Sequence, residues 1–310
     1  MASMHAVRIH SFGDPSVLRI EDIDVPDPKD NEIVIKVHAA SVNPVDYKIR
    51  SGGYLSDDKL PVVLGRDVAG VVYRVGGRVR KFQKGDAVYA MLGRDHGGYV
   101  EYAIANEDEA APKPSKLDFV TAAAVPLAAL TAWQGLFDKG ELKAGQRVLI
   151  HGGAGGVGHF AIQFAKAKGA WVATTVSADD LSFVRELGAD QAIDYKTQRF
   201  EDGVDGIDLV FDLIGGETQN RSFAVLKDGG TLVSTLTRPD EHRAQARNIR
   251  ALNYMAQPSA GQLSEIGRLI EDGAVMPVVQ STYPLEAVAK AQAHMEHDHI
   301  QGKVVLEVAA

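Results

Sequence analysis

The segment Val148-Leu-Ile-His-Gly-Gly-Ala-Gly-Gly-Val-Gly158 carries the strongest local signal for the fold of this chain. Gly-x-Gly-x-x-Gly stands here directly after a strand-like apolar run and directly before a helical run. In that context one glycine permits a tight turn, one lets the backbone approach a pyrophosphate, and one lets the helix pack against the sheet. The helix N-terminus adds N–H groups that favour phosphate. The predicted dinucleotide contacts are Gly153, Gly155, Gly156, Val157 and Gly158, and a glycine-rich turn without a ligand is the alternative.

Strands and helices alternate on both sides of this loop from about residue 120 onwards. Such alternation predicts a parallel sheet with right-handed crossovers, a doubly wound α/β domain. Ligands bind at the carboxyl ends of such strands, so Ile214 and Gly215 are expected to border the cofactor. The expected strands are Arg147–Ile150, Trp171–Val176, Gln191–Ile193, Leu209–Leu213 and Thr231–Ser234, with helices at Phe160–Lys168 and Leu181–Leu187.

The first third of the chain is rich in strand patterns. Glu32–Ala40 alternates apolar and polar residues, the period of a half-buried strand, and short apolar runs follow between glycines and charged residues. This spacing predicts a compact β-barrel-like or sandwich domain. After the alternating region we expect helices at Ser264–Asp272 and Pro284–His294 and a closing strand at Lys303–Val308.

Composition excludes several classes of protein. The chain has 310 residues, and its 33 basic and 41 acidic side chains give a net charge of −8, which argues against a general nucleic-acid binder. It contains no cysteine, so disulfides, thiolate nucleophiles and cysteine-ligated zinc are ruled out. The N-terminus shows no secretory signal pattern, and the apolar stretch Ala122–Trp133 is too short to span a membrane. We therefore expect a cytoplasmic enzyme or small-molecule binder that has no membrane or nucleic-acid partner.

The end of the second strand of the alternating region decides which dinucleotide binds. A carboxylate there would hold the ribose hydroxyls of NADH, whereas a small residue near a cation would admit the 2′-phosphate of NADPH. Ser177 takes this position, and a serine hydroxyl can donate to a phosphate. Asp179 and Asp180 follow and would favour NADH, but we interpret them as a solvated cap on the next helix. The position of Ser177 therefore predicts NADPH.

The chain resembles the medium-chain dehydrogenase/reductase superfamily and, within it, the zinc-independent quinone oxidoreductases of the zeta-crystallin-like group. The segments that carry the resemblance run in family order along the whole chain. They are Ser41–Gly52, Gly65–Asp67 followed by Val68–Gly70, Lys84–Asp86, Ala129–Trp133, the glycine loop, Leu187–Asp190 and Gly302–Leu306.

The resemblance implies a GroES-like catalytic domain formed by residues 1–121 together with 275–310, and an inserted Rossmann domain at residues 122–274. It also implies a homodimer that forms by pairing of edge strands. Two further cofactor contacts follow from it, with Thr131 near the nicotinamide and Tyr195 near the adenosine phosphate. A buried helix-capping threonine is the alternative for Thr131.

The same resemblance bears on metal binding. Zinc-dependent relatives have Cys, His and Glu where this chain has Asn43, Arg66 and Asp67, so no zinc is expected. An ion pair between Arg66 and Asp67 that holds the vacant pocket is one interpretation of these two residues. His294, His297 and His299 are expected to favour the end of a helix electrostatically, with an adventitious metal site as the alternative.

Without zinc, reduction of an electrophilic quinone or enone by NADPH is easier than alcohol oxidation, because hydrogen-bond donors suffice for the developing oxyanion. The resemblance places Asn43, Tyr47, Lys48 and Tyr54 as such donors, with Lys48 the foremost. Asp46 is expected to orient Lys48 or to face the cofactor. Packing tyrosines and a surface lysine are the alternatives. A protein of the same fold that binds NADPH with little turnover, as a redox sensor or structural protein, is the second hypothesis, and a zinc alcohol dehydrogenase is disfavoured.

Overall fold

The computed structural model describes residues 2–308, and the chain divides into two compact units. The first unit comprises Met1–Leu127, Pro258–Asp272 and Pro277–Ala310, and the second comprises Ala128–Gln257 and Gly273–Met276. The second unit is therefore an insertion in the first along the chain. The expected boundaries placed Pro258–Asp272 in the Rossmann domain, whereas this segment is compact with the first unit.

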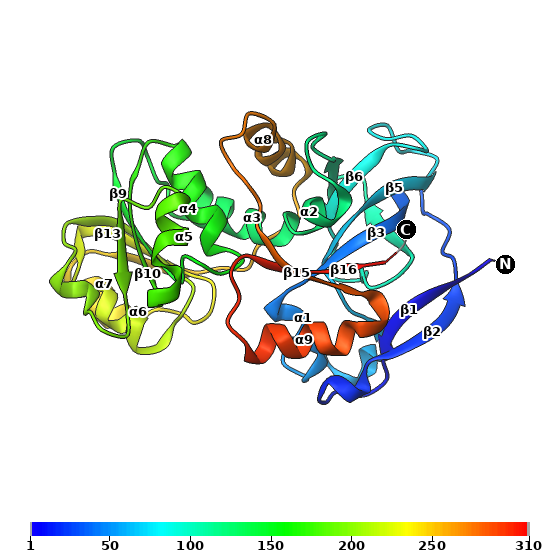
Figure 1. The fold of residues 1–310 in the computed structure, drawn as a ribbon, viewed down its shortest axis with the longest axis horizontal. Helices are drawn as coiled ribbons and strands as arrows, with labels where there is room; N and C mark the ends of the chain where they lie inside the picture. Colours follow the sequence, from blue (N-terminus) through cyan, green and yellow to red (C-terminus); the bar gives the residue numbers. More distant parts are fainter. Residues whose placement is uncertain (1, 309–310) are drawn as a thin grey trace. The chain divides into compact units, whose positions relative to one another are not determined.

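The first unit is built mainly on antiparallel strands, and β15 and β16 alone among its described strands pair in parallel (Figure 1). One sheet has the order β2-β1-β4, and a larger one has the order β15-β16-β3-β5-β6-β8 with β7 also paired to β3. The elements before the insertion are β1 (Ser3–Ile9), β2 (Arg19–Asp24), β3 (Glu32–Val42), α1 (Pro44–Arg50), β4 (Val62–Val63), β5 (Asp67–Val75), β6 (Ala87–Met91), β7 (Tyr102–Asn106), β8 (Ala110–Pro112) and α2 (Phe119–Ala123). Those after it are α8 (Ala260–Glu271), β15 (Val279–Pro284), α9 (Val288–His297) and β16 (Lys303–Glu307).

The last strand returns to the first unit. β16 pairs antiparallel with β3, with Val304 opposite Val42 and Leu306 opposite Ala40. Val304 and Leu306 are fully buried and join the core that residues from β1, β3 and β5 form. Burial of each such side chain stabilises the fold by about 1.5–3 kcal/mol. The strand expected at Lys303–Val308 is therefore present, and both ends of the chain build one core.

The second unit carries a six-stranded parallel sheet in the order β11-β10-β9-β12-β13-β14 (Figure 1). In chain order this is 3-2-1-4-5-6, an order of the doubly wound class that was expected, with a sixth strand, β14, beyond the five expected ones. Its elements are α3 (Pro126–Trp133), which begins in the first unit, a π-helix (Gln134–Lys139), β9 (Arg147–His151), α4 (Gly158–Ala167), β10 (Trp171–Val176), α5 (Leu181–Glu186), β11 (Gln191–Asp194), β12 (Ile207–Asp212), α6 (Gly216–Ser222), β13 (Leu226–Ser234), α7 (Glu241–Ala246) and β14 (Arg250–Asn253).

The order of the strands places the ligand edge of this sheet. It reverses between β9 and β12, so the loops that follow these two strands flank the switch point. The glycine loop follows β9, and the turn with Ile214 and Gly215 follows β12. The expected fold class, a GroES-like β-rich domain plus a doubly wound Rossmann domain, is confirmed. Within residues 2–308, no helix combines the length and apolar character needed to cross a membrane.

Candidate active site

The glycine loop has a tightly packed part at Gly153 and Gly158, which we call its base, and an accessible part at Gly155, which we call its lip. A Cβ on Gly153 would lie 2.1 Å from Thr174 Oγ1, and one on Gly158 would lie 2.1 Å from the Gly152 carbonyl oxygen. A Cβ on Gly155 would meet only the Gly152 carbonyl oxygen, at 3.7 Å. Gly155, Gly156 and Val157 are half-buried. Gly153 and Gly158 are thus required for packing, and the space above Gly155 is open.

The N-terminus of α4 has no competing anion. Val157 is its N-cap and provides no side-chain cap, and the first turn holds no acidic residue. The first amides of a helix have no partner inside the helix, and the helix dipole makes this end positive. The loop therefore has room and unpaired amides of the kind that a pyrophosphate needs, and its predicted dinucleotide contacts stay predictions.

Buried polar side chains hold the base of the loop. His151 Nδ1 lies 2.9 Å from Thr175 Oγ1, and His151 Nε2 lies 2.9 Å from Ser222 Oγ. Because the Ser222 hydroxyl donates to the Thr218 carbonyl oxygen at 2.6 Å, it accepts from His151, which assigns the imidazole proton to Nε2. Burial lowers the pKa of His151 to about 4, so this imidazole is neutral at pH 7.

Asp212 organises the turn after β12. Its carboxylate is fully buried and accepts from the amides of Ile214 and Gly215 and from the side chains of Gln219 and Ser234. Gly215 has φ of 76°, a conformation that a side chain would strain. Ile214 is exposed beyond this turn, at the ligand edge of the sheet.

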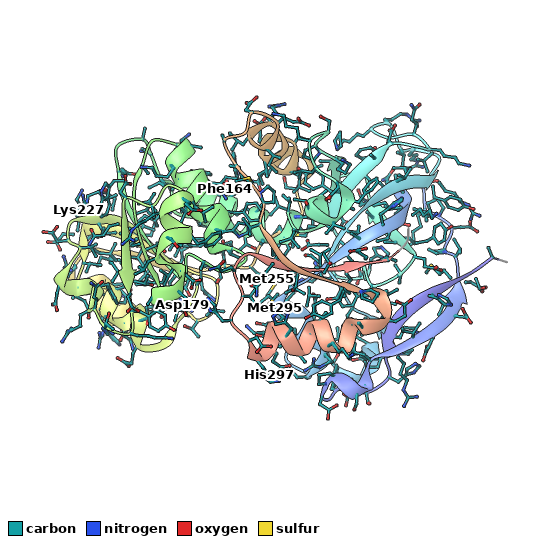
Figure 2. The ribbon with its side chains drawn as sticks, viewed as in Figure 1. Phe164, Asp179, Lys227, Met255, Met295 and His297 are labelled. Atoms are coloured by element: carbon teal, nitrogen blue, oxygen red, sulfur yellow. The ribbon has the colours of Figure 1, made fainter. Side chains whose placement is uncertain are left out.

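The end of β10 differs from the expectation. The Ser177 hydroxyl donates to Asp180 Oδ2 at 2.8 Å, and both residues are buried. The interpretation of Asp180 as a solvated cap is therefore wrong, because its carboxylate is the acceptor for Ser177. Asp179 is exposed and does fit that interpretation (Figure 2).

The neighbouring strand supplies an aromatic ring and a cation. Tyr195 follows β11, and its amide donates to the Val176 carbonyl oxygen at 3.1 Å, which places it beside the end of β10. Its side chain is 59 % exposed, and Lys196 Nζ lies 6.0 Å from the ring centroid. Thr131 is buried in α3, and its carbonyl oxygen accepts from the Tyr254 hydroxyl. The cofactor roles of Ser177, Tyr195, Thr131 and Ile214 stay predictions.

In the first unit, Asn43 lies in a buried polar cluster. Its Nδ2 donates to Asp67 Oδ2 at 2.8 Å, and its Oδ1 accepts from Lys303 Nζ. Asp67 also accepts from Ser41 Oγ and from the Leu127 amide, both at 2.7 Å, and lies 3.8 Å from Lys303 Nζ. The cation that pairs with Asp67 is therefore Lys303, and the expected Arg66–Asp67 ion pair does not form among the described residues.

Helix α1 displays the other predicted donors. Tyr47 and Lys48 are half-buried, Tyr54 is 56 % exposed, and none of the three side chains has a hydrogen bond or ion pair within residues 2–308. They are available to a ligand, whereas the groups of Asn43 are committed to Asp67 and Lys303. Asp46 is fully buried and accepts from the Tyr99 hydroxyl and from the backbone N–H of Asn43, both at 2.8 Å. No hydrogen bond or ion pair joins Asp46 to Lys48 among the described residues, so the expected orienting interaction between these two side chains does not form there.

The polar cluster does not fit zinc. Zinc takes imidazole, thiolate or carboxylate ligands, and Asp67 alone among Asn43, Arg66 and Asp67 offers one. The Lys303 ammonium already lies against the Asp67 carboxylate and the Asn43 amide oxygen. The part of the chain that the structure describes contains no group of three or more His, Cys, Asp or Glu placed to hold a metal ion. In the histidine trio, a hydrogen bond of 2.9 Å joins His294 Nδ1 and the Tyr283 hydroxyl, and His297 ends α9 (Figure 2).

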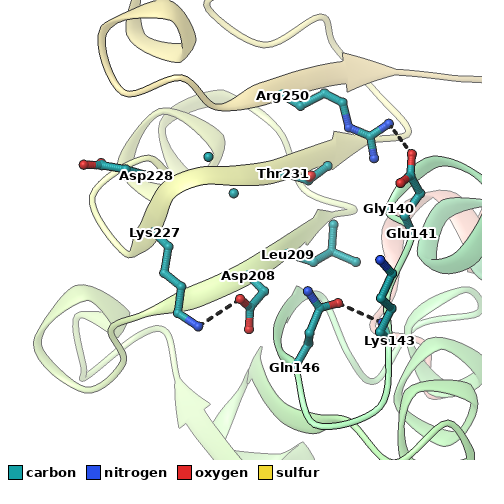
Figure 3. Close-up of a pocket in the computed structure, with 12 residues that line it drawn as sticks. Gly140, Glu141, Lys143, Gln146, Asp208, Leu209, Lys227, Asp228, Thr231 and Arg250 are labelled. Carbon is teal, nitrogen blue, oxygen red and sulfur yellow. Dashed lines mark hydrogen bonds and ion pairs between the residues drawn. The ribbon is translucent and has the colours of Figure 1, made fainter.

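A second hollow lies at the opposite end of the parallel sheet from the glycine loop. This pocket, of about 430 Å³, is lined by residues that precede or begin β9, β12, β13 and β14 (Figure 3). Lys227 pairs with Asp208, and Arg250 pairs with Glu141, each at 2.9 Å. Its charges compensate one another, and it lies away from the switch point where ligands bind.

Two residues of the site escaped the sequence analysis. Lys303 stands in a family motif at the start of an apolar strand, and a lysine at a buried strand position is a signal for a buried ion pair. His151 directly precedes the glycines, but its role depends on Ser222, 71 positions later in the chain. Neither partner can be identified from local sequence.

Comparison with known proteins gives consistent matches along the chain. Residues 29–115 match the family model described as "Alcohol dehydrogenase GroES-like domain", and residues 187–306 match the one described as "Zinc-binding dehydrogenase". The chain is 39 % identical to an NADPH-dependent alkenal/one oxidoreductase of Arabidopsis thaliana, over 95 % of this chain and 77 % of that protein. It is 36 % identical to a quinone oxidoreductase of Pongo abelii, over 98 % and 97 %.

The solved structures agree with these relatives. The quinone oxidoreductase of Coxiella burnetii superposes with a TM-score of 0.92 at 37 % identity, over 99 % of this chain and all of that one. Identity of this extent over nearly the full length shows the family as well as the fold. The chain is thus an oxidoreductase that belongs to the medium-chain dehydrogenase/reductase superfamily, in its quinone oxidoreductase group.

Proposed function

We propose that this enzyme uses NADPH to reduce a quinone or an enone, and that it does so without a metal. The observation that carries the proposal is that the groups of Asn43 and Asp67 are already paired, whereas donors on α1 are not. Lys303 fills the place beside Asn43 and Asp67, while Tyr47 and Lys48 keep free donors. A site with an ammonium and a hydroxyl but no Lewis acid suits acceptors that are already electrophilic. The names of the relatives from Arabidopsis and Pongo support this substrate class.

We propose that NADPH binds along the ligand edge of the parallel sheet. The amides at the start of α4 and the open face of Gly155 would hold the pyrophosphate. Lys196, beside Tyr195 at the end of β11, would offset the charge of the 2′-phosphate, as would the exposed Arg185. The Ser177 hydroxyl donates to Asp180, so Ser177 would supply mainly space for the phosphate. Thr131, Ile214 and Gly215 would border the nicotinamide half.

Bound NADPH would supply the hydride that an electrophilic carbon of the acceptor takes up. The chain would then stabilise the negative charge that develops on the acceptor oxygen, and a proton from water would complete the reduction, at that oxygen in a quinone or at the α carbon in an enone. We propose that the Lys48 ammonium provides the charge stabilisation, and that the Tyr47 hydroxyl donates a hydrogen bond to the same oxygen. Burial raises the pKa of Tyr47, so this hydroxyl keeps its proton and acts as a donor. Tyr54 is the third candidate donor, and the buried Asn43 would act by holding α1.

We further propose that two copies associate through β14, one of the two edge strands of the parallel sheet, and that the enzyme works in the cytoplasm. Both stay predictions. An unpaired edge strand can extend its sheet with a second copy. Light scattering that gives twice the chain mass would support the dimer.

Turnover with defined acceptors tests the proposed function. We expect NADPH absorbance to fall when p-benzoquinone or methyl vinyl ketone is added to the purified protein, and NADH to be consumed more slowly. Ethanol with NADP⁺ should give no reduction, which separates this activity from alcohol dehydrogenation. NADPH binding with no turnover of either acceptor would refute the proposal in favour of an NADPH-binding sensor or structural protein.

A further inference from the structure

A lysine ammonium is buried between the ends of two strands in the first unit. Lys303 opens β16 and is 2 % exposed. Its Nζ donates to Asn43 Oδ1 and to the Val42 carbonyl oxygen, the latter at 3.2 Å, and lies 3.8 Å from Asp67 Oδ2. We name these three oxygens the oxygen pocket. Three oxygens of this kind could bind a cation, and here the cation is the ammonium of Lys303, the first residue of β16.

The Asn43 amide links the ammonium to the carboxylate. Its oxygen faces Lys303, and its nitrogen faces Asp67 at 2.8 Å. A lysine needs an acceptor and a carboxylate needs a donor, so these partners fix the orientation of the amide. Loss of the ammonium would leave the amide oxygen without its donor and would leave the Asp67 charge uncompensated.

Asn43 is also the N-cap of α1, and the opposite end of this helix is fixed as well. The backbone N–H of Asn43 donates to Asp46 Oδ2 at 2.8 Å. At the other end the buried Arg50 donates to the Gly13 carbonyl oxygen, to Gln292 and to Glu296. The half-buried Tyr47 and Lys48 lie between these two anchors. The first anchor depends on Lys303 through Asn43.

Charges around the oxygen pocket make the ammonium hard to replace. Asp46 and Asp67 are both fully buried, and burial raises the pKa of each carboxyl, that of Asp46 to about 6. Lys303 acts against both shifts. The guanidinium of Arg66 also faces the two carboxyls, but it forms no ion pair with either among the described residues, and its Nε has no hydrogen-bond partner there. Lys303 is therefore the cation in direct contact with Asp67.

We propose that Lys303 is a positioning residue whose ammonium, seated in the oxygen pocket, holds Asn43 and through it α1, so that Lys48 is placed for catalysis. This role rests on the proposed function, in which Lys48 stabilises the developing charge. Misplacement of a catalytic group by about 1 Å can cost about a hundredfold in rate. Removal of the ammonium should therefore lower kcat by about that factor.

Chemical rescue tests the proposal. Lys303→Ala opens a cavity beside the oxygen pocket, whereas Lys303→Met fills it without a charge. We expect both variants to lose kcat about a hundredfold and to keep the NADPH dissociation constant of the wild type, because the glycine loop lies in the other unit. Ethylammonium should restore kcat of Lys303→Ala with saturation and leave Lys303→Met unchanged. Tetramethylammonium, which has the charge but no N–H donors, should rescue neither.

The melting temperature supplies a readout that does not depend on turnover. Ethylammonium should raise the melting temperature of Lys303→Ala but not that of Lys303→Met. If the wild type turns over no acceptor, the proposed function fails, and this shift still decides whether the pocket takes a cation. An exposed lysine of β3 provides the control, and Lys36→Met should behave as the wild type. Wild-type kcat in Lys303→Met, or no ethylammonium effect on Lys303→Ala in either readout, would overturn the proposal.

A double variant covers the case in which the single variants do not fold. Lys303→Met combined with Asp67→Asn removes both charges of the pair, so it avoids an unpaired buried charge. We expect it to fold, to bind NADPH and still to lose kcat about a hundredfold, because no ammonium holds the Asn43 oxygen. Wild-type kcat in the double variant would show that Lys303 only neutralises Asp67, which contradicts a positioning role.

Discussion

Valine at Gly155 and valine at Gly158 should have different effects on stability and on NADPH binding. At Gly158 the new Cβ would lie 2.1 Å from the Gly152 carbonyl oxygen and 2.7 Å from Gly153 Cα, both backbone atoms. Carbon contacts are optimal near 3.5 Å, so the loop must move by about 1 Å. Overpacking of this kind costs about 1–3 kcal/mol, and because a backbone cannot swing aside we expect about 3 kcal/mol.

At Gly155 the same Cβ would meet only one oxygen, at 3.7 Å, so folding is unaffected. The side chain would instead occupy the space proposed for the pyrophosphate. An overlap of about 1–3 kcal/mol with the ligand corresponds to a loss of affinity of roughly 10- to 100-fold. Gly155→Val should therefore keep the melting temperature and lose NADPH, whereas Gly158→Val should lower the melting temperature by about 6 °C or more.

Thermal unfolding by circular dichroism and NADPH binding by fluorescence titration measure the two effects separately. Gly261→Val, at an open position of α8 in the first unit, is the control and should change neither NADPH binding nor the melting temperature by more than a few degrees. Wild-type NADPH affinity in Gly155→Val would refute the assignment of this loop to the pyrophosphate. Equal losses of melting temperature in both loop variants would refute the distinction between base and lip.

Three further predictions concern the candidate site, and one concerns acid stability. Lys48→Ala should lower kcat for quinone reduction by about one to three orders of magnitude with little change in NADPH affinity, and the exposed Lys290→Ala should not; unchanged kcat would assign Lys48 to the surface. Elemental analysis of the purified protein should find no stoichiometric zinc, and EDTA should leave turnover unchanged. Ser177→Asp should move the ratio of kcat/KM for the two cofactors towards NADH. Because the Ser177 hydroxyl oxygen lies 2.8 Å from Asp180, a carboxylate at position 177 would repel that of Asp180 by about 4 kcal/mol. The variant that is tested therefore also carries Asp180→Asn. The pKa of His151 is about 4 in the folded protein and 6.5 in the unfolded chain, so the neutral imidazole contributes about 3 kcal/mol to the free energy of unfolding above pH 6.5. This contribution is lost as the pH falls towards 4. The free energy of unfolding in urea should therefore differ less between pH 7 and pH 5 in His151→Gln than in the wild type.

Local pattern was sufficient for most elements of the fold. The expected strand Trp171–Val176 is rich in apolar and β-branched residues, and the structure has it at these bounds. The expected helix at Ser264–Asp272 begins earlier, at Ala260, because Ser259 caps it by accepting from the Gln262 amide. The edge strand Arg250–Asn253 was missed, since it is short and polar at both ends.

Fewer contacts of the candidate site could be predicted from the sequence, because they join segments that lie far apart in the chain. The open lip of the glycine loop follows from spacing alone, but the partner of Asp67 comes from the last strand, 236 positions away. The expectation that Asp180 is solvated failed because the turn after β10 folds its carboxylate back onto Ser177. Such pairings depend on which strand ends meet, and chain topology decides that rather than composition.

The position of deuterium in the product shows whether the enzyme transfers a hydride from NADPH to an enone. NADPH that carries deuterium at the transferred position of the nicotinamide should be mixed with methyl vinyl ketone and the wild-type enzyme, and the product analysed by mass spectrometry and NMR. We predict butanone with one deuterium on the carbon β to the carbonyl, formed at least tenfold more slowly by Lys48→Ala. Unlabelled product, or label on the carbonyl carbon of an alcohol, would contradict this hydride transfer, and so would NADPH that stays bound with no product from either methyl vinyl ketone or p-benzoquinone.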